Sequence, residues 1–127
     1  MLPTELVNTI SSILAAESHS EWLNNYRKNN GNMERIKSIN SEEFNINVEW
    51  NNLHPFWQKE QMKIFIAYLN AWKNYYDIEE YSAIIHDIWL QFNSWCDDSL
   101  KVPFEMLCEE EKEKDRVVAR KINECIL

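Results

Sequence analysis

Two short segments of the chain pair a histidine with a tryptophan at a spacing that could build a binding face. His19 and Trp22 stand in the segment HSEWL, and His86 and Trp89 stand in the segment HDIWL. Residues three apart on a helix lie on one face about a turn from each other, so the imidazole and the indole could receive a flat ligand together. The other interpretation is structural, because Trp in a small helical domain usually lies in the core and a His beside it usually satisfies a backbone carbonyl.

A group of cations forms the second candidate site. Its members, together with one aromatic residue, are Arg27, Lys28, Arg35, Lys37 and Trp50. The cations oppose the sign of the whole chain, whose formal net charge is -8. Cations beside an aromatic ring can hold a phosphate while the ring stacks on a base. We therefore expect this part of the chain to face a pocket for a small anionic ligand, although charges in loops are more often simply solvated.

The sequence carries little that would support catalysis or metal binding. The three histidines, His19, His54 and His86, have no close i, i+4 partner and no neighbouring Cys, which argues against a metal site. Glu109, Glu110 and Glu111 form an acidic run, but at a helix start they stabilise the dipole rather than act as acid and base. We therefore expect a protein that is not an enzyme and uses no cofactor or metal.

Charge and patterning also limit the partners and the location. The 21 acidic residues outnumber the 13 basic ones, which argues against binding a long nucleic acid, because that affinity comes largely from Lys and Arg. The three cysteines are an odd number without CxxC spacing, so reduced thiols are expected. The N-terminus lacks the pattern of a signal peptide, and no apolar run is long enough to span a bilayer. A cytoplasmic protein without a membrane partner is the prediction.

Apolar periodicity predicts a mainly α fold with at most short strands in the loops. A length of 127 residues fits a single domain, and the single Gly argues against an all-β design. Helices are predicted from about Pro3 to Trp22, from Pro55 to about Asn74, from Asp77 onward, and after Pro103. Between the first two, residues 24–47 read as a long loop around Gly31, with one short strand allowed near Phe44.

The third and fourth helices have the clearest signals. Asp77 followed three residues later by Glu80 predicts a capping box at the start of the third helix. Its expected core face is Tyr81, Ile85, Ile88, Phe92 and Trp95. Trp89 is expected to be buried at the edge of this face, with His86 nearer the surface. The fourth helix should begin with its three glutamates and turn Val118, Ile122 and Ile126 inward.

The two halves of the chain echo each other beyond the His-x-x-Trp-Leu core. Residues 48–53 (VEWNNL), with Trp50 inside, parallel residues 102–107 (VPFEML), with Phe104 inside. Both segments then run into a charged helix start. Two divergent copies of one helix-loop-helix unit would explain the pattern. We therefore predict a tandem repeat within one domain, with halves of roughly 1–75 and 76–127.

The last third of the chain resembles the RyR domain, the small helical module first seen as repeats in ryanodine receptors. The resemblance rests on residues 85–90 (IHDIWL), 102–107 (VPFEML) and 109–116 (EEEKEKDR), and the run from Val102 to Arg116 is its most specific part. Carried over by position, the family's His and Trp fall on His86 and Trp89, its Pro-aromatic turn on Pro103 and Phe104, and its acidic helix start with the terminal Asp-Arg on Glu109 to Glu111, Asp115 and Arg116. The first half keeps His19, Trp22 and residues 53–55, but Trp57 and Lys59 replace the acidic start, and neither half has the family's glycine-aromatic-glycine loop.

The resemblance implies a compact ligand-recognition module, and a stand-alone double copy is similar to phage or giant-virus versions. We therefore predict two RyR-like halves packed about a pseudo-twofold, binding a small anionic, nucleotide-derived molecule between them. The alternative is a protein-interaction adaptor or homodimer that uses exposed aromatics as its interface. The predicted ligand-binding residues are His19, Trp22, Arg27, Lys28, Arg35, Lys37, Trp50, His86, Trp89 and Arg116.

Overall fold

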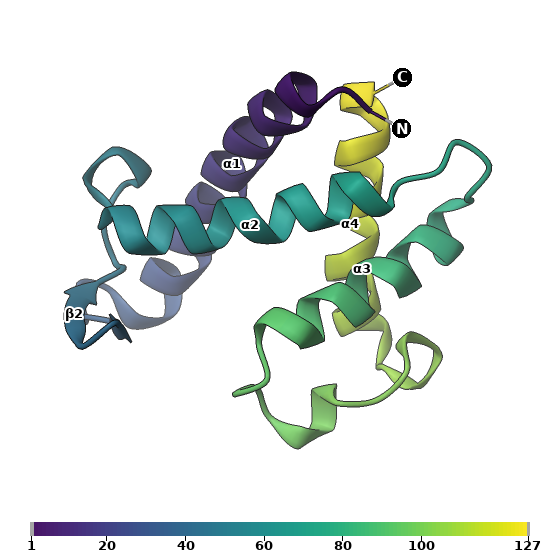
Figure 1. Cartoon of the computed structure of the whole chain (residues 1–127). Helices are drawn as coiled ribbons and strands as arrows, with labels where there is room; N and C mark the ends of the chain where they lie inside the picture. The colour runs from purple at the N-terminus through teal and green to yellow at the C-terminus, as the bar shows by residue number, and fades with distance from the viewer. Residues whose placement is uncertain (1, 127) are drawn as a thin grey trace. The chain divides into compact units, whose positions relative to one another are not determined.

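The computed structural model describes residues 2–126, and within them the chain is mainly helical (Figure 1). The four α-helices are α1 (Thr4–Asn30), α2 (Pro55–Ala71), α3 (Ile78–Phe92) and α4 (Glu109–Ile126). The two strands are β1 (Ile36–Ile39) and β2 (Glu42–Asn45), and the 3-10 turns are η1 (Trp50–Asn52), η2 (Asp98–Leu100) and η3 (Phe104–Met106). The prediction of a mainly α fold with only short strands in the loops is confirmed.

The chain divides into two compact units. The first unit comprises residues 8–65, and the second comprises residues 66 onward together with the segment up to residue 7. The division falls inside α2, ten residues before the boundary near residue 75 that the repeat pattern predicted. None of the described helices is long and apolar enough to cross a bilayer.

The first helix is longer than its apolar pattern predicted. Instead of giving way to a loop at residue 24, α1 continues to Asn30. Its last turn is supported by Asn side chains, because the Nδ2 atoms of Asn29 and Asn30 donate to carbonyl oxygens four residues earlier. Gly31 then ends the helix at φ +59°, and its N–H donates to the carbonyl of Arg27. Arg27 and Lys28 therefore lie on a helix rather than in a loop.

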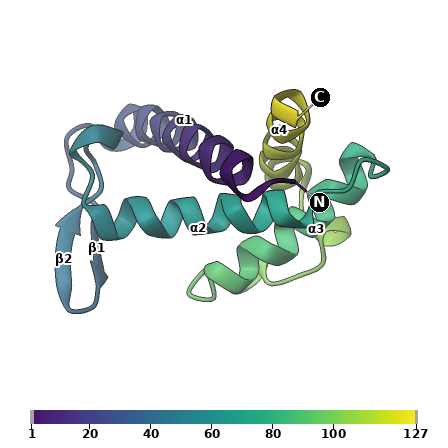
Figure 2. The same ribbon diagram turned by 45° about the horizontal axis from the view of Figure 1, so that its top comes forward.

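A β-hairpin follows α1 in the first unit and is drawn as two arrows in Figure 2. Strands β1 and β2 are antiparallel, with Ile36 opposite Asn45. The two turn residues, Asn40 and Ser41, both have positive φ, as a tight hairpin turn requires. Phe44 of β2 packs with Ile46 and Leu53 in a core cluster that also receives tryptophan side chains.

In the second unit, α3 packs against α4. The predicted capping box is confirmed, since Asp77 accepts from the N–H of Glu80 and the Glu80 carboxylate accepts from the N–H of Asp77. Tyr81 is buried and its hydroxyl donates to the carbonyl of Tyr68 at 2.6 Å. The core side chains of this helix pair include Ile85, Ala119 and Ile122.

One prediction for the helices of this unit needs correction. The core stripe of α3 stops early, because the helix ends at Phe92 and Trp95 is 63% exposed. The helix ends before Asn93, whose backbone leaves the helical region (φ -127°, ψ 49°) and whose side-chain amide also donates to the carbonyl of Trp89. The last helix begins at Glu109 with its three glutamates in the first turn, as predicted, and η3 and an extended Leu107 separate it from Pro103.

Candidate functional site

The two His-Trp segments make the same hydrogen bond within their own units. The Nε2–H of His19 donates to the carbonyl oxygen of Val48 at 2.8 Å. The Nε2–H of His86 donates to the carbonyl oxygen of Val102, also at 2.8 Å. Both imidazoles are buried. Each histidine thus fixes a loop to its helix, as the structural interpretation of a His beside a Trp expects.

The chain that follows each valine also has the same conformation. A 3-10 turn forms, and the N–H of Leu53 or Leu107 donates to the carbonyl three residues earlier, at 3.1 Å in both cases. Both leucines are extended and buried, and α2 or α4 begins two residues later. The short sequence echo therefore corresponds to one local structure that occurs twice, which favours the tandem-repeat hypothesis.

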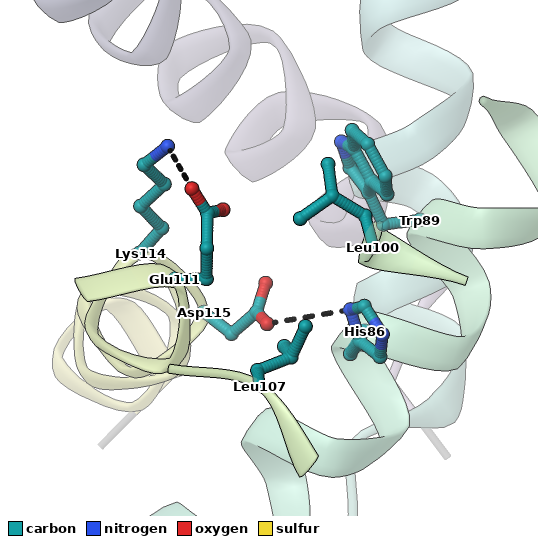
Figure 3. A pocket seen from close by; sticks show the side chains of 7 residues that line it. All are labelled: His86, Trp89, Leu100, Leu107, Glu111, Lys114 and Asp115. Carbon is teal, nitrogen blue, oxygen red and sulfur yellow. Dashed lines mark hydrogen bonds and ion pairs between the residues drawn. The ribbon is translucent and has the colours of Figure 1, made fainter. Parts of the chain in front are cut away.

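Beside His86, the second unit contains a pocket of about 180 Å³. In Figure 3, Trp89 and Leu100 stand across from three side chains of the first turns of α4. The pocket is lined by His86, Trp89, Leu100, Leu107, Glu111, Lys114 and Asp115. It thus brings an indole and an imidazole from α3 toward two carboxyl groups from α4.

Asp115 is the most unusual group in this pocket. Its side chain is only 15% exposed, and its Oδ2 lies 3.6 Å from Nδ1 of His86, too far for a direct hydrogen bond. Burial raises the pKa of Asp115 from 3.8 to about 7, against the opposing effect of His86. The charge of Glu111 raises this pKa further, and Lys114 lowers it. The raised pKa means that part of the Asp115 carboxyl is protonated near neutral pH, and the group keeps hydrogen-bonding capacity toward the pocket.

Burial and the charge of Asp115 both affect the pKa of the neighbouring Tyr68, and Lys114 and Glu111 lie at the mouth of the pocket. Burial, and then the neighbouring charge of Asp115, raises the pKa of Tyr68 above its usual value. At the rim, Nζ of Lys114 lies 2.9 Å from Oε1 of Glu111. The Lys114 side chain is 68% exposed, so the mouth presents a solvated cation beside the more deeply placed carboxyls.

The corresponding positions in the first unit hold aromatic and neutral side chains. Aligning Leu53 with Leu107 places Trp57 where Glu111 stands and Gln61 where Asp115 stands. Trp57 packs against the core cluster, with its ring centroid 6.3 Å from that of Phe44. The indole of Trp57 therefore occupies, in the first unit, the region where carboxylates line the pocket of the second unit.

The predicted His19 face is an aromatic stack. The ring of His19 stacks on Trp22 at a centroid distance of 5.6 Å, and Trp22 stacks on Tyr26 at 4.9 Å. The Trp50 ring lies 6.0 Å from His19 in a tilted arrangement. Three of the predicted site residues, His19, Trp22 and Trp50, thus come together, but their rings contact one another within the fold.

The predicted cations come from different elements, and some are engaged within the fold. Arg27 of α1 donates from Nε to the Asn47 side chain at 2.8 Å and pairs through NH1 with Glu49 at 2.7 Å. Lys37 of β1 lies 5.7 Å from the ring centroid of Trp57. Burial, and then the charge of Arg35, lowers the pKa of Lys37. Lys28 and Arg35 are exposed.

Arg116 ties parts of the second unit together. Its Nε donates to Glu79 of α3 and its NH1 donates to Glu109 of α4, both at 2.8 Å. Its guanidinium also lies 5.9 Å from the ring centroid of Phe104. These contacts assign the residue to the packing of α3, η3 and α4.

The burial of the second His-Trp pair is the reverse of what the pattern predicted. His86 is 3% exposed, whereas Trp89 is only half-buried and lines the pocket. The reason is the hydrogen bond to Val102, which draws the loop over His86 and leaves the next turn of α3 at the pocket wall. Trp89 therefore offers part of its ring surface to the pocket.

Sequence reasoning did not select Asp115, Glu111, Lys114 or Leu100 as site residues. A signal for Asp115 was present, because Asp115, Val118, Ala119 and Ile122 recur at the spacing of one helix face. A carboxyl on an apolar face is the informative observation. Among residues 2–126, no three His, Cys, Asp or Glu side chains gather as a metal site would require.

Comparison with known proteins adds no relative: no family model, no curated protein sequence and no solved structure matches the chain. The likeness to the RyR domain therefore rests on the residues quoted from the sequence and stays a hypothesis.

Proposed function

We propose that the chain is a non-enzymatic ligand-recognition module whose second unit binds a nucleotide-derived molecule, as the RyR-like resemblance implies. The base occupies the pocket of His86, Trp89 and Asp115. The observation that carries this proposal is a buried carboxyl, with a pKa of about 7, on the wall of a pocket that also contains an indole. Perturbed carboxyls of this kind gather at binding sites more often than elsewhere.

The size and lining of the pocket favour a single ring system. Its volume of about 180 Å³ lies below the roughly 300–1,000 Å³ of clefts that bury whole drug-sized ligands. A base placed against the half-buried Trp89 would gain about 1–3 kcal/mol from stacking. Carboxyl oxygens at Asp115 and Glu111 accept from ring N–H and amino groups, and a guanine edge presents both side by side. The anionic phosphate then remains outside, beside the solvated Lys114.

Binding rather than catalysis is the better account of His86. Its Nε2 is committed to the carbonyl of Val102, and its Nδ1 faces Asp115 instead of a nucleophile. A catalytic histidine needs one ring nitrogen directed at the reacting group. In this arrangement the imidazole supports the carboxyl and the loop.

The test is a thermal-shift series confirmed by calorimetry on the full chain. Guanosine monophosphate, adenosine monophosphate and ribose 5-phosphate are compared, since a ligand at a hundred times its Kd stabilises by about 2.7 kcal/mol. We expect a shift with a nucleotide and none with ribose 5-phosphate. Asp115→Asn should weaken nucleotide binding, whereas Glu110→Gln, which removes an exposed neighbouring charge, should not. Equal shifts with ribose 5-phosphate, or unchanged binding by Asp115→Asn, would contradict the proposal.

A further inference from the structure

A second hollow in the second unit runs along the opposite face of α3 from the buried face. Two depressions, of about 390 and 450 Å³, share Ala83, Phe104 and Glu105 and therefore form one groove. Its apolar lining includes Ile84 and Leu90 of α3 as well as the Phe104 ring of η3. We call this feature the α3–η3 groove. None of these groups lines the His86 pocket.

The groove has the length of a short helix. Its lining on α3 extends from Glu79 to Leu90. A helical rise of 1.5 Å per residue makes that distance about 17 Å, which equals about three turns of a second helix. Apolar side chains at i, i+3, i+4 and i+7 of such a helix would face the lining.

The walls of the groove carry an uncompensated negative charge. Lys101 and Lys112 line it, but they pair with Asp98 and Glu109 outside its lining. Among residues 2–126, neither Asp87 on α3 nor Glu105 on η3 forms an ion pair or a side-chain hydrogen bond. Both are exposed. Two unpaired carboxylates, from two different elements, therefore line the groove together with its apolar side chains.

We propose that the α3–η3 groove binds a basic amphipathic helix of a partner protein. The apolar stripe of that helix lies on Ala83, Ile84 and Phe104, and cations flanking the stripe pair with Asp87 and Glu105. Charge complementarity selects this occupant, because a nucleic acid or an anionic membrane surface would meet unpaired carboxylates and be repelled. The proposal does not rest on nucleotide binding, since the groove and the pocket use different residues of α3.

The experiment pans a displayed library of random 16-residue peptides against the immobilised full chain. Enriched peptides should carry Leu, Ile or Phe at helical spacing with Lys or Arg on both sides. The best peptide is then synthesised, and its Kd is measured by fluorescence anisotropy against two double variants. Asp87→Lys with Glu105→Lys should weaken binding by roughly tenfold or more, whereas Glu43→Lys with Glu124→Lys, the same charge change at exposed positions outside the groove, should change it less than about twofold.

Two further measurements distinguish binding in the groove from non-specific attraction of basic peptides to an acidic protein. A scrambled peptide of the same composition should bind at least about tenfold more weakly, because it cannot place its apolar side chains on one face. Ala83→Glu should block binding while circular dichroism shows an unchanged helix content. The proposal is overturned if no peptide is enriched, or if both double variants weaken binding equally. It is also overturned if the chain self-associates in light scattering and the groove variants abolish that association, since the occupant would then be a second copy.

Discussion

The segment around His19 and the segment around His86 each make an equivalent hydrogen bond within their own unit. They differ in the helix turn that comes after the loop held by this bond. In both, an imidazole holds the carbonyl of a valine at 2.8 Å. After the shared turn, the first unit places Trp57 against its core, whereas the second unit places Glu111 and Asp115 beside a pocket. Both units have the histidine, the turn and the buried leucine in common. The helix turn that follows packs against the core in the first unit and lines the proposed binding pocket in the second.

Trp57 and Glu111 occupy equivalent positions in the two units. Exchanging them should give the largest change in the free energy of unfolding, and a very different change in each unit. Trp57→Glu should cost about 3–5 kcal/mol of unfolding free energy, because it removes a packed indole and places a charge among aromatic rings. Glu111→Trp should change stability by less than about 1 kcal/mol, because it only fills the pocket. Urea denaturation measures both, and Trp57→Phe is the conservative control. Similar costs for the two exchanges would show that the units do not differ as described.

Removing the His–Val hydrogen bond from either unit should lower the free energy of unfolding by a similar amount. His19→Ala and His86→Ala each leave a valine carbonyl without its partner and open a small cavity, so about 2–4 kcal/mol is expected in each case. Chemical denaturation gives the two values, and replacement by Gln tests whether a side-chain N–H restores part of the loss. A neutral effect of either Ala variant would remove the argument for a common scaffold.

The pH dependence of stability should distinguish the second unit. The pKa of Asp115 is raised from 3.8 to about 7, so its folded state binds a proton more tightly than the unfolded state. The associated stability is present below about pH 4 and is lost as pH rises through about 7. Between pH 5 and pH 8 the wild type should lose about 2–3 kcal/mol relative to Asp115→Asn, which keeps His86, Glu111, Lys114 and Tyr68 in place. Gln61→Glu, at the corresponding position of the first unit, serves as a reciprocal variant.

The outcome that would contradict this is a difference between wild type and Asp115→Asn that does not change with pH. Denaturation curves at several pH values for the two proteins are sufficient to decide it.

The smallest effect is expected for the ion pair of the first unit. Arg27 pairs with Glu49 on a partly exposed surface, so Arg27→Gln should cost about 1 kcal/mol or less. Lys28→Gln, one residue along the same helix, is the matched control. A larger loss for Arg27 would show that its bond to Asn47 matters more than the ion pair.

Local signals predicted the helix starts well, and tertiary contacts decided the rest. The Asp77–Glu80 capping box and the glutamates that open α4 were readable, because each depends on neighbours within one turn. The extension of α1 to Asn30 was not, since Asn side chains that usually favour loops here bond back to the helix. The burial of His86 rather than Trp89 depends on Val102, sixteen residues away.

The sequence predicted only the α3 side of the candidate site. His86 and Trp89 were found through their spacing on a helix, but their pocket is completed by α4, whose position follows from packing. Arg27 was predicted as part of a cation cluster and Arg116 from the family resemblance, yet both are held by carboxylates from other elements. Asp115 was overlooked because a charged run conceals a carboxyl on the inward face.

The most direct test of the proposed binding site in the second unit is the number of protons released when a nucleotide binds. Calorimetric titration of guanosine monophosphate at pH 7, in buffers of different ionisation enthalpy, measures this number. A base that donates to Asp115 binds its ionised form, so protons should be released on binding at pH 7, because the raised pKa of Asp115 leaves part of the carboxyl protonated in the free protein. Asp115→Asn should release none. Binding without proton release in the wild type, or no detectable binding, would contradict the assignment of this pocket.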